Sequence, residues 1–512
     1  MARWGWRCAG LALILLALGQ RAALLPAFLH PFYTPDSSGF IFPVHDLLDH
    51  GWNPTAAFYR EAGYPVLVAA LLSVTDSYQT VGLLQLGLSM LTPLLVWAAW
   101  RRCLPLVPSH LVWVHHLFGL LVLAILLFHG GILSNAVILG PEILLMAGVA
   151  LQLWLLTAAL TTQTPGRRLA ASCLAVFLAL SLYVVRPHWL MGGILTLGLA
   201  GGLALRCRIG LWWRFGALVC AVGAALAGAL LPNKILTTPA YPAATSTFLP
   251  VTLACWHLPI VLEPLRQAAF QAPDGRRQLL LDAVAEGETS LQQHGAYPVL
   301  GWDADYCMYL SQLPGRMLAA YDRDGSAAGR VLTHSFIQGV LDRPLWYGAK
   351  VWREWKIILS RPMGYEKVDT RFDARNVPQD HPSPSFARLS PQLASGFDFR
   401  SADAVPLRLG PVFRAITRRG NDIFVAVLAA AILLTGWRYW RGQGQAALRP
   451  VLHLPAVLCW AGISLTCALV HSLEISRYVD MQVPATAFSL GLALLAIVMA
   501  LFPDRQGKGL PN

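Results

Sequence analysis

Residues 111–129 read LVWVHHLFGLLVLAILLFH, and this stretch contains no lysine, arginine, aspartate or glutamate. An apolar run of about this length crosses the ~30 Å hydrocarbon core of a bilayer as a helix. Further apolar runs of comparable length lie at 5–28, 80–100, 142–160, 169–185, 188–205, 211–231, 422–437, 451–470 and 484–502. The sequence therefore predicts an all-α integral membrane protein with about ten transmembrane helices.

The composition supports a membrane location. Hydrophobic residues make up 56% of the chain and charged residues 13%, whereas a soluble globular protein carries about 25% charged residues. The net charge is +12, but the basic residues stand in short clusters between apolar runs and form no continuous stretch. This pattern indicates membrane topology, and it does not favour a nucleic-acid partner.

The spacing of the apolar runs divides the chain into three parts. Residues 1–231 hold seven predicted spans and an acidic first outer loop, 232–419 form a large loop domain, and 420–512 hold three predicted spans. We expect the loop domain to be mainly helical, with helices near 276–286 and 346–359. The apolar stretch 64–73 is too short to cross a bilayer, so we expect a juxtamembrane or re-entrant helix there.

Charge asymmetry predicts the orientation, because cytoplasmic loops are enriched in lysine and arginine. With the N-terminus in the cytoplasm, only one acid, Asp504, falls in the cytoplasmic segments. Their basic residues are Arg3, Arg7, Arg101, Arg102, Arg167, Arg168, Arg206, Arg208, Arg214, Arg438, Arg441, Arg449, Arg505 and Lys508. We therefore predict a multi-pass protein of a cell membrane, such as a bacterial inner membrane, with both termini cytoplasmic and the large loop extracytoplasmic.

Most acids that lie outside the large loop belong to the predicted outer face. They are Asp36, Asp46, Asp49, Glu61, Asp76, Glu142, Asp422, Glu474 and Asp480. Any carboxylate chemistry is therefore expected on that face. Two of the nine cysteines, Cys255 and Cys307, lie in the large loop. An oxidising compartment would permit a disulfide between them, and two free buried thiols are the alternative.

No nucleotide-binding element is visible in the sequence. There is no GxxxxGK[ST] motif, no βαβ unit surrounds a GxGxxG motif, and the cytoplasmic segments are short. Any activated substrate must therefore reach the protein through the membrane or from outside.

Four residues at the predicted outer face are candidates for a functional site. Asp36 lies in a Pro-Asp-Ser-Ser-Gly turn soon after the first span, and Glu142 opens the fourth span. A solvated Asx-turn and a favourable charge at a helix N-terminus are the structural alternatives. Arg186 and Arg477 stand at outer span ends, where they either reach toward the headgroups or pair with a carboxylate or phosphate. His115 and His116 have no acid or thiol at metal-ligand spacing, so we expect polar packing and no metal site.

Several short elements occur in a recognisable order along the chain. Arg60-Glu-Ala-Gly-Tyr-Pro65 precedes an apolar run, and Glu474-Ile-Ser-Arg477-Tyr478 with Pro484 precedes the last span. This order resembles the GT-C superfamily of integral membrane glycosyltransferases, most closely the branch of protein O-mannosyltransferases and lipid A aminoarabinose transferases. The resemblance covers residues 1–230 and 420–500 and leaves the large loop out.

The resemblance implies an inverting glycosyltransferase that takes a sugar from a polyprenyl-phosphate carrier to a lipid, glycan or protein acceptor. Asp36 would then be the base or acceptor-orienting acid, with Glu142 as a second acid. The donor phosphate would be held by Arg477, Tyr478, Arg60 and Arg186. Some members of the family use a divalent ion and others do not, so the sequence leaves the cofactor open. The alternatives are a flippase or transporter of lipid-linked sugars and a non-catalytic subunit of a glycan assembly complex.

Overall fold

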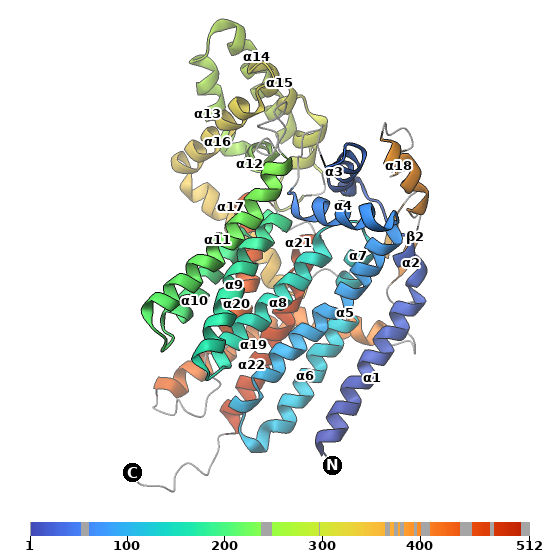
Figure 1. Ribbon diagram of the computed structural model, residues 1–512. Helices are drawn as coiled ribbons and strands as arrows, with labels where there is room; N and C mark the ends of the chain where they lie inside the picture. Colours follow the sequence, from blue (N-terminus) through green and yellow to red (C-terminus); the bar gives the residue numbers. More distant parts are fainter. Residues whose placement is uncertain are drawn as a thin grey trace.

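A computed structural model of the chain describes residues 2–52, 61–236, 248–295, 297–363, 369–372, 377–378, 383–393, 397–400, 410–440, 453–471 and 476–502. The described chain is almost entirely helical. Apolar helices form an elongated bundle, and a group of shorter helices covers one end of it (Figure 1). We call this the loop-domain end. The N-terminal end of α1 and the C-terminal end of α22 lie at the opposite end.

Six helical segments within the described residues are long and apolar enough to cross a membrane. They are Tyr78–Leu106, Ser109–Val137, Glu142–Thr161, Pro165–Val185, Arg418–Arg438 and Val483–Leu501. The first four and the last of these segments contain the helices α5 (Tyr78–Arg102), α6 (Val112–Leu127), α7 (Gly130–Val137), α8 (Glu142–Thr161), α9 (Pro165–Val185) and α22 (Val483–Leu501). The segment Arg418–Arg438 lies within the longer helix α19 (Gly410–Trp440). Together with the composition, these segments indicate a multi-pass membrane protein and coincide with six of the predicted spans.

Three further predicted spans also form apolar helices. These are α10 (Leu190–Leu205), α11 (Leu211–Leu236) and α20 (Leu454–Val470). Helices α10 and α20 approach closely where Gly192 faces Gly462, because a Cβ on Gly462 would lie 2.3 Å from the Cα of Gly192. Small residues permit this kind of close helix contact within a membrane.

The predicted span 5–28 is interrupted. Helix α1 runs over Ala2–Ala23, Leu24 adopts a turn, and α2 covers only Leu25–Leu29. Pro26 stands in the first turn of α2, and its ring cannot continue a helix from the preceding turn without a clash. The helical hydrogen bonding is therefore interrupted at Leu24, near the loop-domain end of the bundle.

The loop domain packs around its own hydrophobic core. It contains α12 (Phe248–Cys255), α13 (Leu258–Phe270), α14 (Asp274–Leu291), α15 (Leu313–Ala320) and α16 (Gly325–Asp342). The core includes Trp256, Leu265 and Trp302. Cys255 and Cys307 form a disulfide across it, so the oxidised alternative of the sequence prediction is the observed one. The predicted helices near 276–286 and 346–359 are confirmed as α14 and α17 (Pro344–Ser360).

The chain between α17 and α19 returns toward the first outer loop. It contains β1 (Asp369–Phe372) and β2 (Phe397–Arg400), which pair antiparallel with Asp369 opposite Arg400, and the short helix α18 (Pro384–Leu389). Helix α18 packs against α3 (Ser38–Asp49), near α4 (Gly63–Thr75). The stretch 64–73 is therefore helical, as expected. The predicted domain boundaries at 231 and 419 fall inside α11 and α19.

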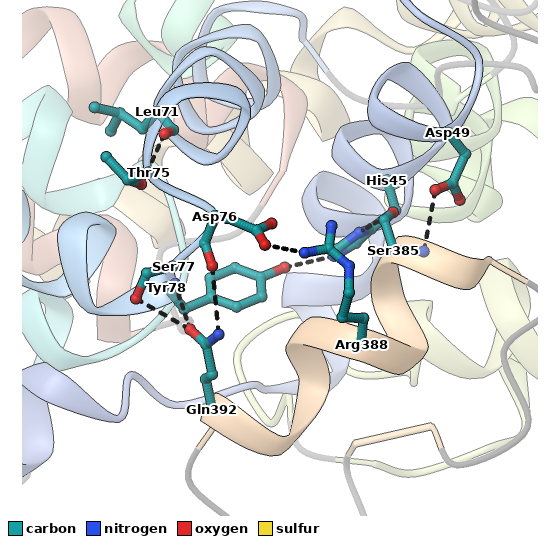
Figure 2. A network of polar contacts seen from close by, with 10 residues as sticks. All are labelled: His45, Asp49, Leu71, Thr75, Asp76, Ser77, Tyr78, Ser385, Arg388 and Gln392. Carbon is teal, nitrogen blue, oxygen red and sulfur yellow. Dashed lines mark hydrogen bonds and ion pairs between the residues drawn. The ribbon is translucent and has the colours of Figure 1, made fainter.

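Figure 2 shows the contacts that hold α18 in place. His45 on α3 contacts Ser385 Oγ through Nδ1 and Tyr78 OH through Nε2, both at 2.7 Å. Asp49 accepts hydrogen bonds from Ser383 Oγ at 2.5 Å and Ser385 N at 3.0 Å. These bonds satisfy polar groups at the start of α18, so two segments more than 300 residues apart in sequence form one unit.

Candidate functional site

The first outer loop and the segment before α8 are joined by a short backbone bridge. Phe32 N donates to Val137 O at 2.8 Å, and Leu139 N donates to Phe32 O at 2.8 Å. Ser37 Oγ adds a 2.8 Å bond to Leu139 O. Asp36 stands four residues beyond this bridge, and Glu142 stands four residues beyond Ile138, the partner of Phe32. The bridge therefore brings the two predicted acids to the same end of the bundle.

Asp36 forms an ion pair with Arg477. Asp36 lies in a 3-10 turn over Pro35–Ser37, and Arg477 lies on the short helix α21 (Ser476–Asp480) between α20 and α22. The two side chains are 40% and 30% exposed, respectively. This pair is therefore open to water and to any ligand that reaches the loop-domain end.

Glu142 forms a second ion pair, with Arg186 at the C-terminus of α9. Here the exposed fractions are 8% for Glu142 and 2% for Arg186. The Arg186 guanidinium also lies over the Phe40 ring, 5.4 Å from its centroid. A buried charge is costly unless it is paired, so the contact with Glu142 allows Arg186 to lie inside the protein.

Tyr478 connects the two pairs. Its ring centroid is 5.2 Å from the Arg477 guanidinium and 5.8 Å from the Arg186 guanidinium, and the residue is buried. Arg477 also interacts electrostatically with Glu142. The two cations, the two carboxylates and the phenol therefore form a single cluster, which we call the paired-arginine cluster (Asp36, Glu142, Arg186, Arg477 and Tyr478).

The loop domain contributes polar groups beside this cluster. Tyr297 donates a hydrogen bond to Asp305, and Asp305 interacts electrostatically with Asp36 and Arg477. Burial, together with the nearby charges of Asp303 and Asp36, raises the pKa of Asp305 above its ordinary value. A carboxyl group with a raised pKa can exchange a proton nearer to neutral pH, which is a common property of acid–base groups.

Aromatic rings join the loop domain to the membrane helices at the same place. The Trp256 and His471 rings lie 4.0 Å apart between centroids, and His471 meets the Tyr478 ring edge-on at 5.1 Å. Trp256 also packs edge-on against Tyr297 at 4.8 Å. The loop domain therefore covers the side of the cluster on which Tyr478 lies.

The structure brings together five of the six predicted site residues. The sixth, Arg60, lies outside the described residues. Glu474, the predicted outer acid three residues before Arg477, also lies outside them. The sequence analysis missed Asp305 and Tyr297, because it treated the loop domain as a separate unit. The available signal was the run Asp303-Ala-Asp-Tyr-Cys307, two acids next to a cysteine that a disulfide holds in place.

Other acids of the first outer loop have different partners. Asp46 contacts His50 Nδ1 at 3.1 Å, and Asp49 holds α18. Neither contact belongs to the paired-arginine cluster.

The described part of the chain contains no group of three or more His, Cys, Asp or Glu side chains placed to hold a metal ion. His115 contacts the Trp100 carbonyl oxygen through Nε2 at 3.1 Å and stacks on the Trp100 ring, which is the polar packing expected for it.

The sequence was compared with protein-family models and with curated proteins, and the structure with solved structures. None of these comparisons found a match, so the functional proposal rests on the residues of the site.

Proposed function

We propose that the protein is a membrane glycosyltransferase that moves a sugar from a polyprenyl-phosphate carrier to an acceptor at the loop-domain end. In this proposal the bundle crosses the membrane about ten times, the termini are cytoplasmic and the loop domain is extracytoplasmic. The observation that supports the proposal is the paired-arginine cluster, in which two arginines and two carboxylates lie together at the end of the apolar bundle beside the loop domain.

The two ion pairs have different tasks in this mechanism. The Asp36–Arg477 pair is half-exposed, so a phosphate group can compete with Asp36 for Arg477. An arginine fork matches phosphate oxygens as well as it matches a carboxylate. The Glu142–Arg186 pair is buried, and its expected task is to position Tyr478, whose ring lies 5.8 Å from the Arg186 guanidinium. Of the two predicted acids, Asp36 is therefore the one that a substrate reaches.

Substrate binding would activate Asp36 through this competition. When the carrier phosphate takes over Arg477, the carboxylate loses its cationic partner and becomes a stronger base. Asp36 then accepts the proton of the acceptor hydroxyl. The acceptor oxygen forms a bond to the anomeric carbon while the bond from that carbon to the phosphate oxygen breaks. The negative charge stays on the polyprenyl phosphate, beside Arg477.

Two other features support a lipid-linked donor. The cluster lies at the ends of the apolar helices α8 and α9, so a polyprenyl chain can lie along the bundle while its phosphate reaches the cluster. Asp305 and Tyr297 on the loop domain stand next to Asp36 and Arg477. In the proposal they line the acceptor side and orient its hydroxyl.

A substitution at Arg477 tests the proposal. Arg477→Lys keeps the positive charge but removes the two-pronged geometry, so we expect sugar transfer to fall by about tenfold or more. The matched control is Arg388→Lys, because Arg388 pairs with Asp76 on the exposed surface near α18, away from the cluster. Purified protein in lipid nanodiscs would be incubated with radiolabelled polyprenyl-phosphate mannose, glucose or aminoarabinose and a membrane extract.

The same labelled carriers separate the alternatives when transfer is measured in nanodiscs and movement of the carrier is measured with the protein in sealed vesicles. Transfer of label by the wild type, loss in Arg477→Lys and normal transfer in Arg388→Lys support the enzyme. Movement of labelled carrier across a vesicle bilayer without transfer would indicate a flippase and overturn the proposal. Equal transfer of label by Arg477→Lys and Arg388→Lys would still support an enzyme, but it would show that Arg477 does not bind the carrier phosphate.

A further inference from the structure

The short helix α7 is connected to both halves of the Asp36–Arg477 ion pair. At its C-terminal end, Val137 O accepts the 2.8 Å hydrogen bond from Phe32 N, four residues before Asp36. At its other end α7 packs against α21, the helix that carries Arg477. Both helices lie at the loop-domain end of the bundle (Figure 1). The two partners of the ion pair therefore share one support.

The contact between α7 and α21 involves Gly131 and Asp480. A Cβ on Gly131 would lie 2.7 Å from Asp480 Cγ and 2.9 Å from each of its carboxylate oxygens, which is closer than a real Cβ approaches other atoms. Both residues are buried, and Asp480 is only 6% exposed. The carboxylate therefore lies directly against the backbone of α7, where glycine leaves room for it.

The first turn of α7 is also a favourable place for a negative charge. Gly131 is the second residue of this helix, and the first N–H groups of a helix have no partner within the helix and form the positive end of its dipole. Alanine would favour the helix more than glycine does. The glycine is therefore explained by the approach of Asp480 and not by helix propensity.

Hydrogen bonds fix the part of α7 that Asp480 contacts. Gly131 N donates to His129 Nδ1 at 3.1 Å. Because Nδ1 accepts this bond, a neutral ring carries its hydrogen on Nε2, which then donates to Met363 O at 2.8 Å. Asn135 Nδ2 donates to Gly131 O at 2.7 Å. The first turn of α7 is thus held in place independently of α21.

We propose that Asp480 and Gly131 are positioning residues that hold Arg477 within reach of Asp36. Asp480 follows Arg477 by three residues on α21, and residues three apart are neighbours on a helix surface. Moving the Asp480 carboxylate away from α7 therefore moves Arg477 as well. Both residues act through Arg477 and neither contacts the substrate. The effect on sugar transfer rests on the proposed function, whereas the effect on α21 does not.

Hydrogen exchange of residues 476–480 in the full-length chain in nanodiscs tests the contact without an assay of sugar transfer. Gly131→Ala places a methyl group in the space of the carboxylate, and Asp480→Asn removes the charge. In both variants we expect the amides of α21 to exchange about tenfold faster, as for the loss of a partly buried charge at a helix N-terminus.

Each variant has a matched control that should leave this exchange unchanged. Gly87→Ala adds the same methyl group to the transmembrane helix α5, where nothing would lie within 4 Å of it. Asp422→Asn removes a carboxylate that pairs with Arg419 on the surface. Elution volume in gel filtration checks that every variant is folded.

The transfer assay then connects the contact to the paired-arginine cluster. In the wild-type background Gly131→Ala and Asp480→Asn should each lower kcat/KM for the carrier by about tenfold or more, because a small misplacement of a binding group has a large effect on rate. In the Arg477→Lys background the same changes should cost less than about twofold, because the geometry that they disturb is already lost. A merely structural role would lower transfer by the same factor in both backgrounds.

The two measurements separate the possible failures. Unchanged exchange of residues 476–480 in both variants would overturn the proposal, whatever the wild type transfers. Faster exchange with an equal loss of transfer in both backgrounds would also overturn it, since the loss would not pass through Arg477. Faster exchange in a protein whose wild type transfers no sugar would support the placement of Arg477 by α7 and contradict the proposed function instead.

Discussion

Arg186 and Arg477 at the loop-domain end each contact a carboxylate, whereas Arg7 and Arg101 at the opposite end line a cavity with tryptophans and histidines. Both ends hold two arginines near a predicted membrane boundary, so the difference lies in the partners. A ligand phosphate at the first end must displace a carboxylate and thereby changes the basicity of that carboxylate. The arrangement at the first end therefore suits a reaction.

Topology labelling is the test with the largest expected effect, because its outcome is all or none. A cysteine at Gln292, exposed at the end of α14, should react with an impermeant maleimide in intact cells. A cysteine at Ser109, exposed between α5 and α6, should react only after the membrane is permeabilised. Cys8 and Cys220 are exposed and would be replaced by serine in both variants. Reversed labelling would exchange the faces assigned to the two ends.

The buried pair at the loop-domain end should show the largest stability effect. Glu142→Gln leaves Arg186 buried without its carboxylate, which typically costs about 3–5 kcal/mol. Thermal unfolding in detergent measures the loss. Asp422→Asn is the control, since Asp422 pairs with Arg419 on the surface and such pairs contribute about 0–1 kcal/mol. The double variant Glu142→Gln/Arg186→Met should recover part of the stability. If Glu142→Gln is as stable as the control, the pair does not support the cluster.

Asp36→Asn should separate activity from stability. Loss of a general base typically lowers a rate by about 10²–10⁴, so we expect sugar transfer to fall at least about 100-fold. The Asp36–Arg477 pair is half-exposed, so the stability change should stay below about 1 kcal/mol. Because Asp36 competes with phosphate for Arg477, the KM for the carrier should be unchanged or lower.

Asp46→Asn is the control for this variant, because Asp46 lies in the same loop and contacts His50. Normal transfer by Asp36→Asn together with a loss in Asp46→Asn would place the catalytic acid elsewhere in the same loop. A rise in the carrier KM would contradict the competition between Asp36 and phosphate.

The sequence predicted the helices well because a bilayer demands long apolar runs, and such runs can be counted directly. Residues 111–129 and 484–502 are examples. The sequence predicted the span 5–28 less well, because counting apolar residues does not take into account the effect of Pro26 on the helix. The candidate acids and arginines were found because charged residues are rare at span ends and therefore stand out.

The three-dimensional arrangement of the cluster could not be predicted in the same way. Asp36 and Glu142 come together through the bridge between Phe32 and Ile138, which joins irregular segments about a hundred residues apart. No sequence periodicity encodes that pairing. Asp305 reaches the cluster because the whole loop domain folds back over Tyr478, and this placement depends on the contacts of Trp256 and His471. Local sequence patterns predict individual helices, whereas these contacts depend on how separate helices and loops pack together.

The smallest expected effect concerns the attachment of α18 to α3 at the loop-domain end. Burial raises the pKa of Asp49, but hydrogen bonds from Ser383 and Ser385 outweigh it and leave the pKa below the ordinary value. A carboxyl group whose pKa is lower in the folded state stabilises that state above its unfolded pKa of about 3.9. The contribution is lost as the pH falls through the folded value. Asp49 is half-buried, so we expect its charge to contribute about 1 kcal/mol or less to the attachment of α18.

Hydrogen exchange of residues 383–393 should therefore be slow at pH 6 and faster, after correction for intrinsic rates, at pH 3. Asp49→Asn should show the faster exchange at both values, and Asp46→Asn should behave as the wild type. A wild-type segment that exchanges equally at both pH values would show that the backbone of α18, and not the charge of Asp49, holds it against α3.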